Sequence, residues 1–179
     1  MTVPIEIDVW QGEIAELEVD AILIPANESL FMTTRVGRAV RLRGGESVEL
    51  DAVQQGPMEA GTAVVTNGGE LAAPYVIHVI GVGHDLRPDA ERLRRAMDVG
   101  LQLASNLGLA RLAVAPIGAE RGVFDAEEAA EALLDVLSAR AAAGDALPTS
   151  LVVAVSGGAE AAAYHAMLAA REAAREAAT

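Results

Sequence analysis

The sequence predicts an α/β fold of three layers (α/β/α), with helices on both faces of a central sheet that is mixed but largely parallel. Short apolar runs alternate along the chain with longer amphipathic or alanine-rich segments, which is the pattern of successive strand–helix units. The chain has 179 residues and is 52% hydrophobic, so it is long enough for one buried core and too short for two ordinary domains. We therefore expect one domain over residues 1–179.

Six apolar runs are expected to form the strands. The run at 19–24 is almost continuously apolar, as is typical of a strand that is buried on both faces. Asn67-Gly68-Gly69 is a strong turn signal between two runs that are rich in β-branched residues. The expected strands are residues 3–10, 19–24, 63–66, 75–80, 112–115 and 151–155.

Five segments are expected to be helical. The best marked begins at Asp125, where Asp125-Ala126-Glu127-Glu128 has the pattern of a capping box, in which the aspartate accepts from first-turn amides and the glutamate reaches back. The alanine-rich tail at 170–179 is expected to be a solvated helix end that frays. The expected helices are residues 36–43, 46–55, 88–107, 125–143 and the segment after Ser156-Gly157-Gly158.

The composition excludes several classes of chemistry. The chain has 13 basic and 26 acidic residues, a formal net charge of −13, no cysteine and no lysine. Disulfides, thiolate nucleophiles and Cys-ligated metals are therefore excluded, as are P-loop and Schiff-base lysines. A strongly acidic chain lacks the basic face that nucleic acid requires, and the charge itself is accounted for by solubility.

The location is expected to be cytoplasmic, with no membrane partner. No apolar run approaches the roughly 18–20 residues that cross a bilayer, and the first ten residues lack the pattern of a secretory signal. We also expect no metal site. His78 lies in an apolar strand, which favours a satisfied core histidine, while His84-Asp85 and His165 are isolated and lack ligand spacing.

Three junctions between a strand and a helix carry the residues that suggest a ligand site, because α/β proteins bind ligands beyond the carboxyl ends of their strands. Asn27 offers an amide that suits a ribose hydroxyl, with a cap or turn residue as the alternative. The loop at 116–125 has two glycines that allow a phosphate to approach the backbone. Its Phe124 either stacks on a sugar or packs against the core. Ser156-Gly157-Gly158 is similarly placed, although an ordinary turn accounts for it.

Four arginines lie within nine residues of one another in the segment that follows Asn27: Arg35, Arg38, Arg41 and Arg43. They stand out because the chain as a whole is acidic. Arginine binds phosphate oxygens through a charged fork of N–H groups. The expected ligand is therefore a small molecule that bears phosphate.

Several segments carry a family pattern in a fixed order. They are Gln11-Gly12-Glu13-Ile14, the residues 19–22 followed by 26–30, the residues 61–66, the residues 75–78 and the residues 111–118. Together they resemble the macro domain, a module of the ADP-ribose-binding and ADP-ribose 1″-phosphate-processing family, over Gln11 to about Met167. The resemblance, to a divergent bacterial type of this family, implies a mixed sheet of six or seven strands between helices.

The resemblance also implies roles for individual residues. Glu13 would accept the adenine exocyclic amine, Ile14 would offer a backbone amide, and Asn27 would bind the distal ribose, against which Phe124 would lie. Two loops would bind the phosphates. The implied ligand-binding set is Glu13, Ile14, Asn27, Thr33, Thr34, Arg35, Val36, Gly118, Ala119, Glu120, Arg121, Gly122, Val123 and Phe124, with no cofactor besides the ligand ADP-ribose.

The chain departs from the family pattern at positions that bear on catalysis. Thr33-Thr34-Arg35 replaces a glycine run, so Arg35 is expected to pair with a phosphate directly. Ile24 replaces the first Asn of the motif. Gly37 stands ten residues after Asn27, where de-ADP-ribosylating members carry a water-orienting Asp.

We therefore expect a protein that binds ADP-ribose or ADP-ribosylated molecules, with weak or no hydrolysis. One alternative is a hydrolase that acts on ADP-ribosyl esters, ADP-ribosylated proteins or ADP-ribose 1″-phosphate, with Asn27 as its catalytic residue. The other is a degenerate domain whose cleft is closed by Thr33-Thr34-Arg35 and which serves in protein–protein contact.

Overall fold

Six strands form one sheet in the computed structural model, which describes residues 5–178. The order across the sheet is β1-β6-β5-β2-β4-β3, and every neighbouring pair is parallel except β3 and β4. This confirms the predicted sheet, which is mixed and largely parallel. The strands are β1 (Glu6–Gln11), β2 (Ala21–Pro25), β3 (Thr62–Asn67), β4 (Tyr75–Ile80), β5 (Arg111–Val114) and β6 (Ser150–Val155). Of the strand predicted at 3–10, residues 3 and 4 lie outside the described residues and residue 5 precedes the start of β1.

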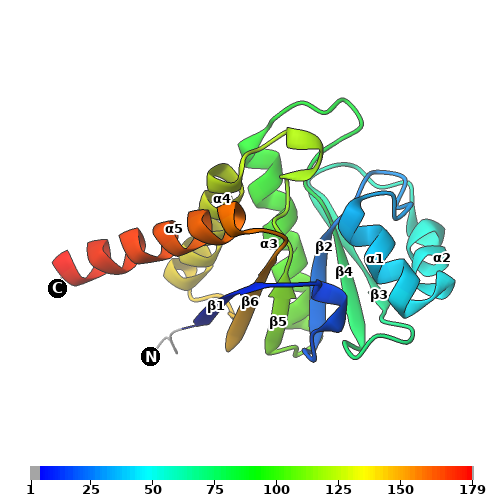
Figure 1. Ribbon diagram of the computed structural model, residues 1–179, viewed down its shortest axis with the longest axis horizontal. Coiled ribbons are helices and arrows are strands. Elements are labelled where there is room, and N and C mark those ends of the chain that lie inside the picture. Colours follow the sequence, from blue (N-terminus) through cyan, green and yellow to red (C-terminus); the bar gives the residue numbers. More distant parts are fainter. Residues whose placement is uncertain (1–4, 179) are drawn as a thin grey trace.

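Helices cover both faces of the sheet (Figure 1). One face is covered by α3 (Ala90–Asn106), α4 (Ala126–Ala143) and α5 (Gly158–Ala177), and the other by α1 (Arg35–Gly44) and α2 (Glu46–Gln55). The α2 boundaries agree with the prediction, and the other helices differ from it by one or two residues at the ends that were predicted. Two short 3₁₀ turns, η1 (Ile14–Glu16) and η2 (Glu120–Gly122), were not predicted.

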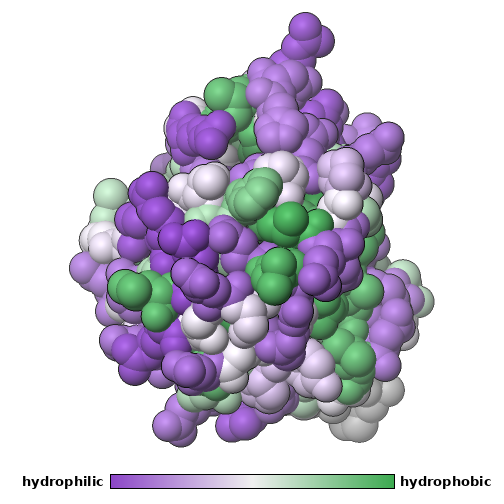
Figure 2. Space-filling model, turned by 90° about the vertical axis from the view of Figure 1, so that its right-hand side faces the viewer, coloured by the Kyte–Doolittle hydropathy of each residue, from purple (hydrophilic) through white to green (hydrophobic). Residues whose placement is uncertain are grey.

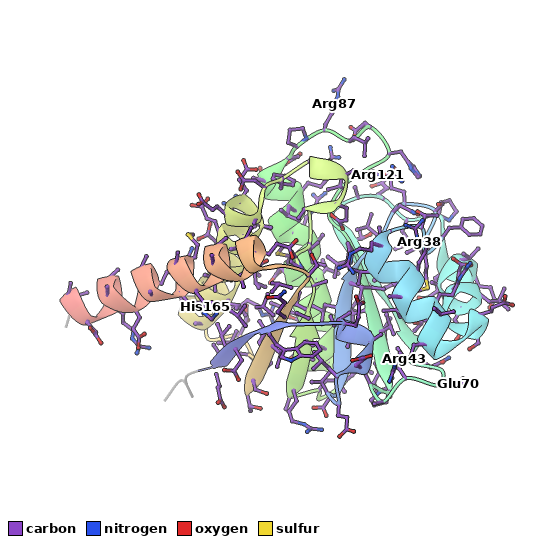
Figure 3. The ribbon with its side chains drawn as sticks, in the orientation of Figure 1. Arg38, Arg43, Glu70, Arg87, Arg121 and His165 are labelled. Atoms are coloured by element: carbon purple, nitrogen blue, oxygen red, sulfur yellow. The ribbon has the colours of Figure 1, made fainter. Side chains whose placement is uncertain are left out.

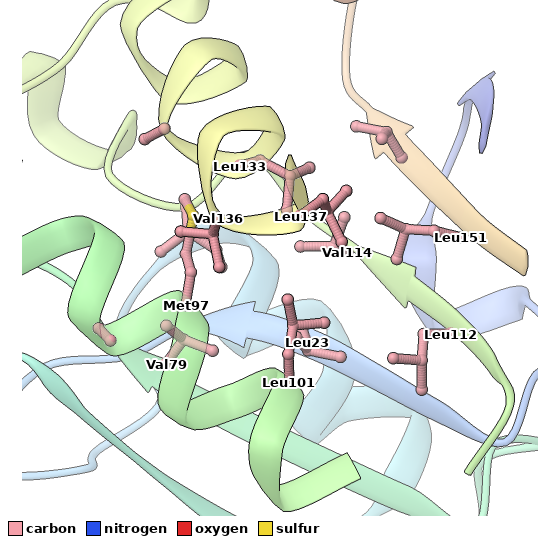
Figure 4. Packing of buried hydrophobic residues seen from close by; sticks show 14 of the residues in the cluster. Leu23, Val79, Met97, Leu101, Leu112, Val114, Leu133, Val136, Leu137 and Leu151 are labelled. Carbon is pink, nitrogen blue, oxygen red and sulfur yellow. The ribbon is translucent and has the colours of Figure 1, made fainter. Parts of the chain in front are cut away.

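The strand β2 packs against helices on both of its faces. Ala21 and Leu23 lie in the cluster formed with α3 and α4 (Figure 4), while Ile22 and Ile24 lie in the cluster on the α1 side. Successive side chains of a strand point to opposite faces, so a strand with a helix layer on each side requires apolar residues at every position. This is why the run at 19–24 is continuously apolar.

The capping box at the start of α4 is formed as predicted. The Asp125 carboxylate accepts from the Glu128 amide at 2.8 Å, and the Glu128 carboxylate accepts from the Asp125 amide at 2.9 Å. The other end of α4 is held by Arg140, whose guanidinium donates to Asp98 on α3 at 2.7 Å and to the Ala146 carbonyl. Only 3% of Arg140 is exposed. Arg140 therefore joins α4 to α3 from inside the protein.

His78 is a core histidine, as predicted. It lies on β4, is 1% exposed, and its Nε2 is 2.9 Å from the Thr66 hydroxyl. Burial lowers the pKa of His78 to about 4, because an imidazolium is poorly solvated in the core. His78 is thus neutral at physiological pH and satisfied by one hydrogen bond.

The last helix, α5, extends away from the rest of the molecule at its C-terminal end (Figure 1). Tyr164 anchors it in the core, and Arg171 joins it to Asp135 of α4. The helix continues to Ala177, and residues 172–178 are exposed. The exposure of residues 172–178 agrees with the expected solvated end, residue 179 lies outside the described residues, and fraying stays a prediction. None of the helices within residues 5–178 is long and apolar enough to cross a bilayer.

The face formed over α1 and α2 is mainly hydrophilic, with separate groups of hydrophobic side chains (Figure 2). Leu42 on α1 and Leu50 on α2 are 88% and 58% exposed. Isolated exposed apolar residues are ordinary on a protein surface, and these two need no functional explanation.

Candidate ligand-binding cleft

A cleft opens where the strands β2 and β5 end side by side. After β2 the chain turns toward α1 and the β3–β4 side of the sheet, and after β5 it turns toward α4 and β6. Such a reversal leaves a crevice beyond the carboxyl ends of the two strands. The cleft has a volume of about 300 Å³ and shares lining residues with a pocket of about 30 Å³. The cleft is lined by Pro25, Thr33, Thr34, Arg35, Val36, Arg38, Pro116, Ala119, Glu120, Arg121, Ser156 and Glu160, and the pocket by Ala26, Asn27, Thr34, Val82, Gly83, His84, Leu86, Glu120 and Arg121.

The first turn of α1 forms one wall of the cleft. Thr34 is the N-cap residue, and its hydroxyl accepts from the Gly37 amide at 2.9 Å. The amides of Arg35 and Val36 have no partner within residues 5–178, as is usual at a helix start. The predicted first phosphate loop thus lies in the cleft with two N–H groups available.

The four arginines of α1 do not act as one cluster. Arg41 pairs with Glu49 at 2.9 Å, and Arg43 pairs with Glu16 at 3.3 Å. Arg38 lies near the cleft end of the helix and Arg43 near the opposite end (Figure 3). Because a helix rises about 1.5 Å per residue, arginines that are close in sequence are spread along its length. Of these four arginines of α1, Arg35 and Arg38 line the cleft and the other two do not.

Arg35 pairs with Glu13 at 3.1 Å, and both side chains are about half exposed. The guanidinium that was predicted to bind phosphate and the carboxylate that was predicted to bind adenine are therefore joined to each other. Glu13 precedes η1 and does not line the cleft, and the Ile14 side chain is buried in the core. An exposed pair of this kind contributes little to stability, so a ligand can separate it at low cost.

Asn27 uses its side-chain amide within its own loop. Its Nδ2 donates to the Phe31 carbonyl at 2.9 Å and to the Thr33 hydroxyl at 3.1 Å, and its Oδ1 accepts from the Ser29 hydroxyl at 2.7 Å. These are the contacts of a turn-organising residue, which was the alternative for this position. Asn27 does line the small pocket, so the residue borders the cleft while holding the loop in shape.

The second loop, at 118–124, forms the opposite wall. The Phe124 amide donates to the Gly118 carbonyl at 3.1 Å and closes the loop. Gly118 has φ +92°, and a Cβ there would lie 2.9 Å from Leu93 and 3.0 Å from Phe124, so glycine is required by conformation and by space. Arg121 has φ +56°, a left-handed conformation that is costly for arginine. This conformation places Arg121 along the cleft.

Phe124 packs in the core, which was the alternative given for it, and it does not line the cleft. Phe124 is 6% exposed and belongs to the hydrophobic cluster of α3 and α4. It packs there because it follows the turn η2 and directly precedes the capped start of α4. Gly118, Gly122, Val123 and Phe124 therefore shape the second loop, while Ala119, Glu120 and Arg121 line the cleft.

A family model described as "Macro domain" matches residues 24–133, more than half of the chain. The chain belongs to the macro domain family. It is 38% identical over 145 residues to a macro domain-containing protein of Cupriavidus necator, and the match covers 76% of this chain and 83% of that protein. An uncharacterised protein of Aquifex aeolicus is 32% identical over 131 residues, covering 73% and 79%. A match to a longer Mycobacterium tuberculosis protein spans 73% of this chain and 36% of the relative.

Solved macro domains share the fold. The Oceanobacillus iheyensis macrodomain with MES bound superposes with a TM-score of 0.83 at 18% identity, over 94% of this chain and 93% of that one. The Trypanosoma brucei macrodomain in complex with ADP-ribose gives a TM-score of 0.82 at 21% identity, over 91% and 69%. At these identities the likeness establishes the architecture of this macro domain and leaves its site to be argued from its own residues.

No role was predicted from the sequence for the side chain of Glu120, a residue of the macro domain cleft. It lines both the cleft and the small pocket. Its Oε2 atom is inaccessible to solvent and has no hydrogen-bond partner within the described chain. Burial raises the pKa of Glu120 to about 7, although amides of Glu120 and Gly118 and the charge of Arg121 oppose the rise. A carboxyl group with this pKa changes its charge at physiological pH.

His84 also reaches the site, through the loop that follows β4. The Glu28 carboxylate accepts from the His84 amide at 2.9 Å and holds this loop against the first one. His84 was expected to be isolated because its partner, Glu28, lies 56 residues away in the chain. His84, Arg38 and Glu160 line the cleft or its pocket with charged or titratable side chains and were not predicted as site residues.

The third junction also contributes to the cleft. The Ser156 amide and hydroxyl both donate to Glu160, at 2.8 and 2.9 Å. The turn prediction for Ser156-Gly157-Gly158 is confirmed, since Gly157 caps the start of α5. Its position at the end of β6 nevertheless brings Ser156 to the cleft wall.

Proposed function

We propose that this macro domain binds ADP-ribose, or a closely related ADP-ribosyl nucleotide, in the cleft between α1 and η2, with weak or no hydrolysis. The observation that carries the proposal is the pair Arg38 and Arg121. Both line the cleft, one from α1 and one from η2, and neither side chain has a hydrogen-bond or ion-pair partner within residues 5–178.

Unpaired arginines are unusual in a chain with a net charge of −13. Most other arginines pair with carboxylates, including the two neighbours of Arg38 on α1, Arg41 and Arg43. Two free guanidinium groups beside open amides at the start of α1 suit a diphosphate, which offers several oxygens and two negative charges. A macrodomain of this fold has been solved with ADP-ribose, which supports the choice of ligand.

The absence of an acid at Gly37 supports binding without rapid hydrolysis. Gly37 is buried in α1, and a Cβ there would lie 2.9 Å from the Thr34 hydroxyl and 3.3 Å from Met32. A carboxylate side chain would not fit without displacing the N-cap. The side chain expected to orient a water in the hydrolysing members is thus missing at this position and is disfavoured by packing.

Isothermal titration calorimetry with ADP-ribose tests the proposal. We expect Arg38→Ala and Arg121→Ala each to weaken binding by about 1–3 kcal/mol, because each removes a charged hydrogen bond. Arg35→Ala should cost less, because Glu13 already neutralises Arg35. The matched control is Arg87→Ala. Arg87 lies on the outer loop and points away from the body (Figure 3), so its loss should change the affinity less than twofold.

Two results would contradict the proposal. One is no binding heat at high micromolar ADP-ribose, which would favour the protein-contact alternative. The other is equal affinity in the Arg38, Arg121 and Arg87 variants. Incubation with a mono-ADP-ribosylated protein tests the hydrolase alternative in parallel. Rapid release of ADP-ribose that Asn27→Ala abolishes would replace the binding proposal with that alternative.

A further inference from the structure

The carboxyl group of Glu120 lies where the proposed function places an anion. It borders both the cleft and the small pocket, next to Arg121 and opposite Thr34. Its Oε2 is the one buried side-chain oxygen or nitrogen among the described residues that lacks a partner. An unpaired buried polar atom costs free energy, and the cost is larger when the group is charged, so burial favours a neutral Glu120 carboxyl group that has a hydrogen-bond partner in the cleft.

The charge of Glu120 decides which partner that is. An ionised carboxylate only accepts hydrogen bonds and repels phosphate, whereas a protonated one donates an O–H. The charge of Arg121 and the amides of Glu120 and Gly118 favour the ionised form, but the desolvation of the carboxyl group outweighs them. A neutral Glu120 therefore fits an anionic ligand, and a charged one opposes it.

We propose that Glu120 binds the ligand as a neutral carboxylic acid, donating its O–H in a hydrogen bond to an oxygen of the phosphate-bearing ligand. Binding is then accompanied by uptake of a proton. The inference rests on the proposed function, because it requires an anion in the cleft. It assigns a direct side-chain contact to Glu120, which was expected from the sequence only as one residue of a phosphate-binding loop.

The pKa of Glu120, raised by burial to about 7, is consistent with this chemistry. At neutral pH the free carboxyl is close to half protonated, so little free energy is needed to complete the protonation. At pH 8.5 most free molecules must take up a proton before they bind. The affinity then falls in proportion to the fraction of free molecules that are protonated, since protonation and binding are linked equilibria.

Other charged groups face Glu120 and have to be separated from it. The arginines stay charged at every relevant pH, and the acid on α5 already accepts from Ser156. His84 is the one imidazole among these neighbours, and its Nε2 lies 3.7 Å from the Glu28 carboxylate. These neighbours are Arg35 and Arg38 on α1, Arg121 on η2, His84 on the loop after β4, and Glu160 on α5.

The test is calorimetry with ADP-ribose at pH 6.0 and pH 8.5, repeated in buffers that differ in ionisation enthalpy. The wild-type dissociation constant should rise at least tenfold between the two pH values, and the buffer series should show uptake of about one proton at pH 8.5. Glu120→Gln should bind with less than threefold dependence on pH. His84→Gln, the matched control, should keep the wild-type dependence.

The outcomes separate this proposal from the proposed function. Binding that is tight, independent of pH and without proton uptake overturns the part assigned to Glu120 and leaves ADP-ribose binding intact. A pH dependence that His84→Gln removes and Glu120→Gln retains also overturns it. No binding at any pH between 6.0 and 8.5 overturns both. The buffer series on the wild-type protein decides the matter even if the Glu120 variant fails to fold.

Discussion

Asn27 contributes to the cleft by holding the shape of a loop. Its amide satisfies the Phe31 carbonyl and the hydroxyls of Ser29 and Thr33, so one side chain organises the turn between β2 and α1. A ligand that used the same amide would have to replace at least one of these bonds. Asn27 is therefore better described as a positioning residue for the first loop than as a direct ligand contact.

The burial of Glu120 has a consequence for stability that is independent of any ligand. The pKa of Glu120 in the folded chain, about 7, lies above the ordinary value of 4.5. The folded state thus holds the proton more tightly than the unfolded state. The free energy of unfolding should decrease as the pH rises from about 4.5 to about 7, by up to about 3 kcal/mol for this one group.

Glu120→Gln removes the titrating group and should abolish this loss. We expect the variant and the wild type to have similar unfolding free energies near pH 5, and the variant to be more stable by about 2–3 kcal/mol at pH 8. Urea denaturation at both pH values measures the difference. The control, Glu70→Gln, changes an exposed residue and should shift stability by less than about 0.5 kcal/mol. Equal stability of all three proteins at pH 8 would show that Glu120 is not desolvated.

The elements that the sequence predicted best are those with local signals. The boundaries of β4 and α2 were predicted to the residue, and the α4 capping box was predicted with its partners. Apolar patterns and caps involve residues within a few positions of each other. The turn η2 has no such signal, because Arg121 adopts a left-handed conformation usual for glycine.

The site was less predictable than the fold, for the same physical reason. The two strand-end loops were predicted from the chain, since each follows a buried strand. The burial of Phe124 and the presence of His84 at the cleft depend on packing between elements far apart in sequence. Arg38 was visible in the arginine run. Its separation from Arg41 and Arg43, however, required knowing where Glu49 and Glu16 lie.

Arg140 forms the buried polar link between α3 and α4. The side chain is almost fully buried and donates to Asp98, Gln102 and Ala146. Arg140→Ala leaves these acceptors without a donor and creates a cavity, so we expect a loss of about 2–4 kcal/mol in the free energy of unfolding. Thermal or urea denaturation measures it.

Arg94→Ala is the matched control for that experiment. Arg94 also joins α3 to α4, through Asp135 at 3.0 Å, but both side chains are more than a third exposed and Asp135 keeps Arg171 as a partner. Its loss should cost less than about 1 kcal/mol. Equal losses in the two variants would mean that burial does not set the strength of the Arg140 contacts.

Across the whole molecule, the cleft is assembled from the ends of four parallel strands. The loops after β2, β4, β5 and β6 all contribute lining residues, although they are spread over most of the sequence. A ligand in the cleft therefore contacts both halves of the sheet at once. Its binding free energy adds to the stability of the folded chain as a whole.

ADP-ribose should accordingly raise the melting temperature. At a concentration of 100 times the dissociation constant it adds about 2.7 kcal/mol, which corresponds to about 5–10 °C for a chain of this size. Differential scanning fluorimetry measures the shift. Ribose without phosphate should give none, and the double variant of Arg38→Ala and Arg121→Ala should lose most of it. A shift of the same size in the double variant would contradict the placement of the phosphates.

The order of charges along α1 has one further consequence. Peptide dipoles make the start of a helix partly positive and its end partly negative. Arg41 and Arg43, in the last turn, complement this dipole, whereas Arg35 and Arg38 stand at the positive end, where the first turn has no acidic residue. Glu13 pairs with Arg35, but Arg38 has no such pair within residues 5–178, so the start of α1 stays partly unbalanced until an anion arrives. Because any small anion relieves that imbalance, discrimination in favour of a nucleotide must come from contacts beyond the phosphates.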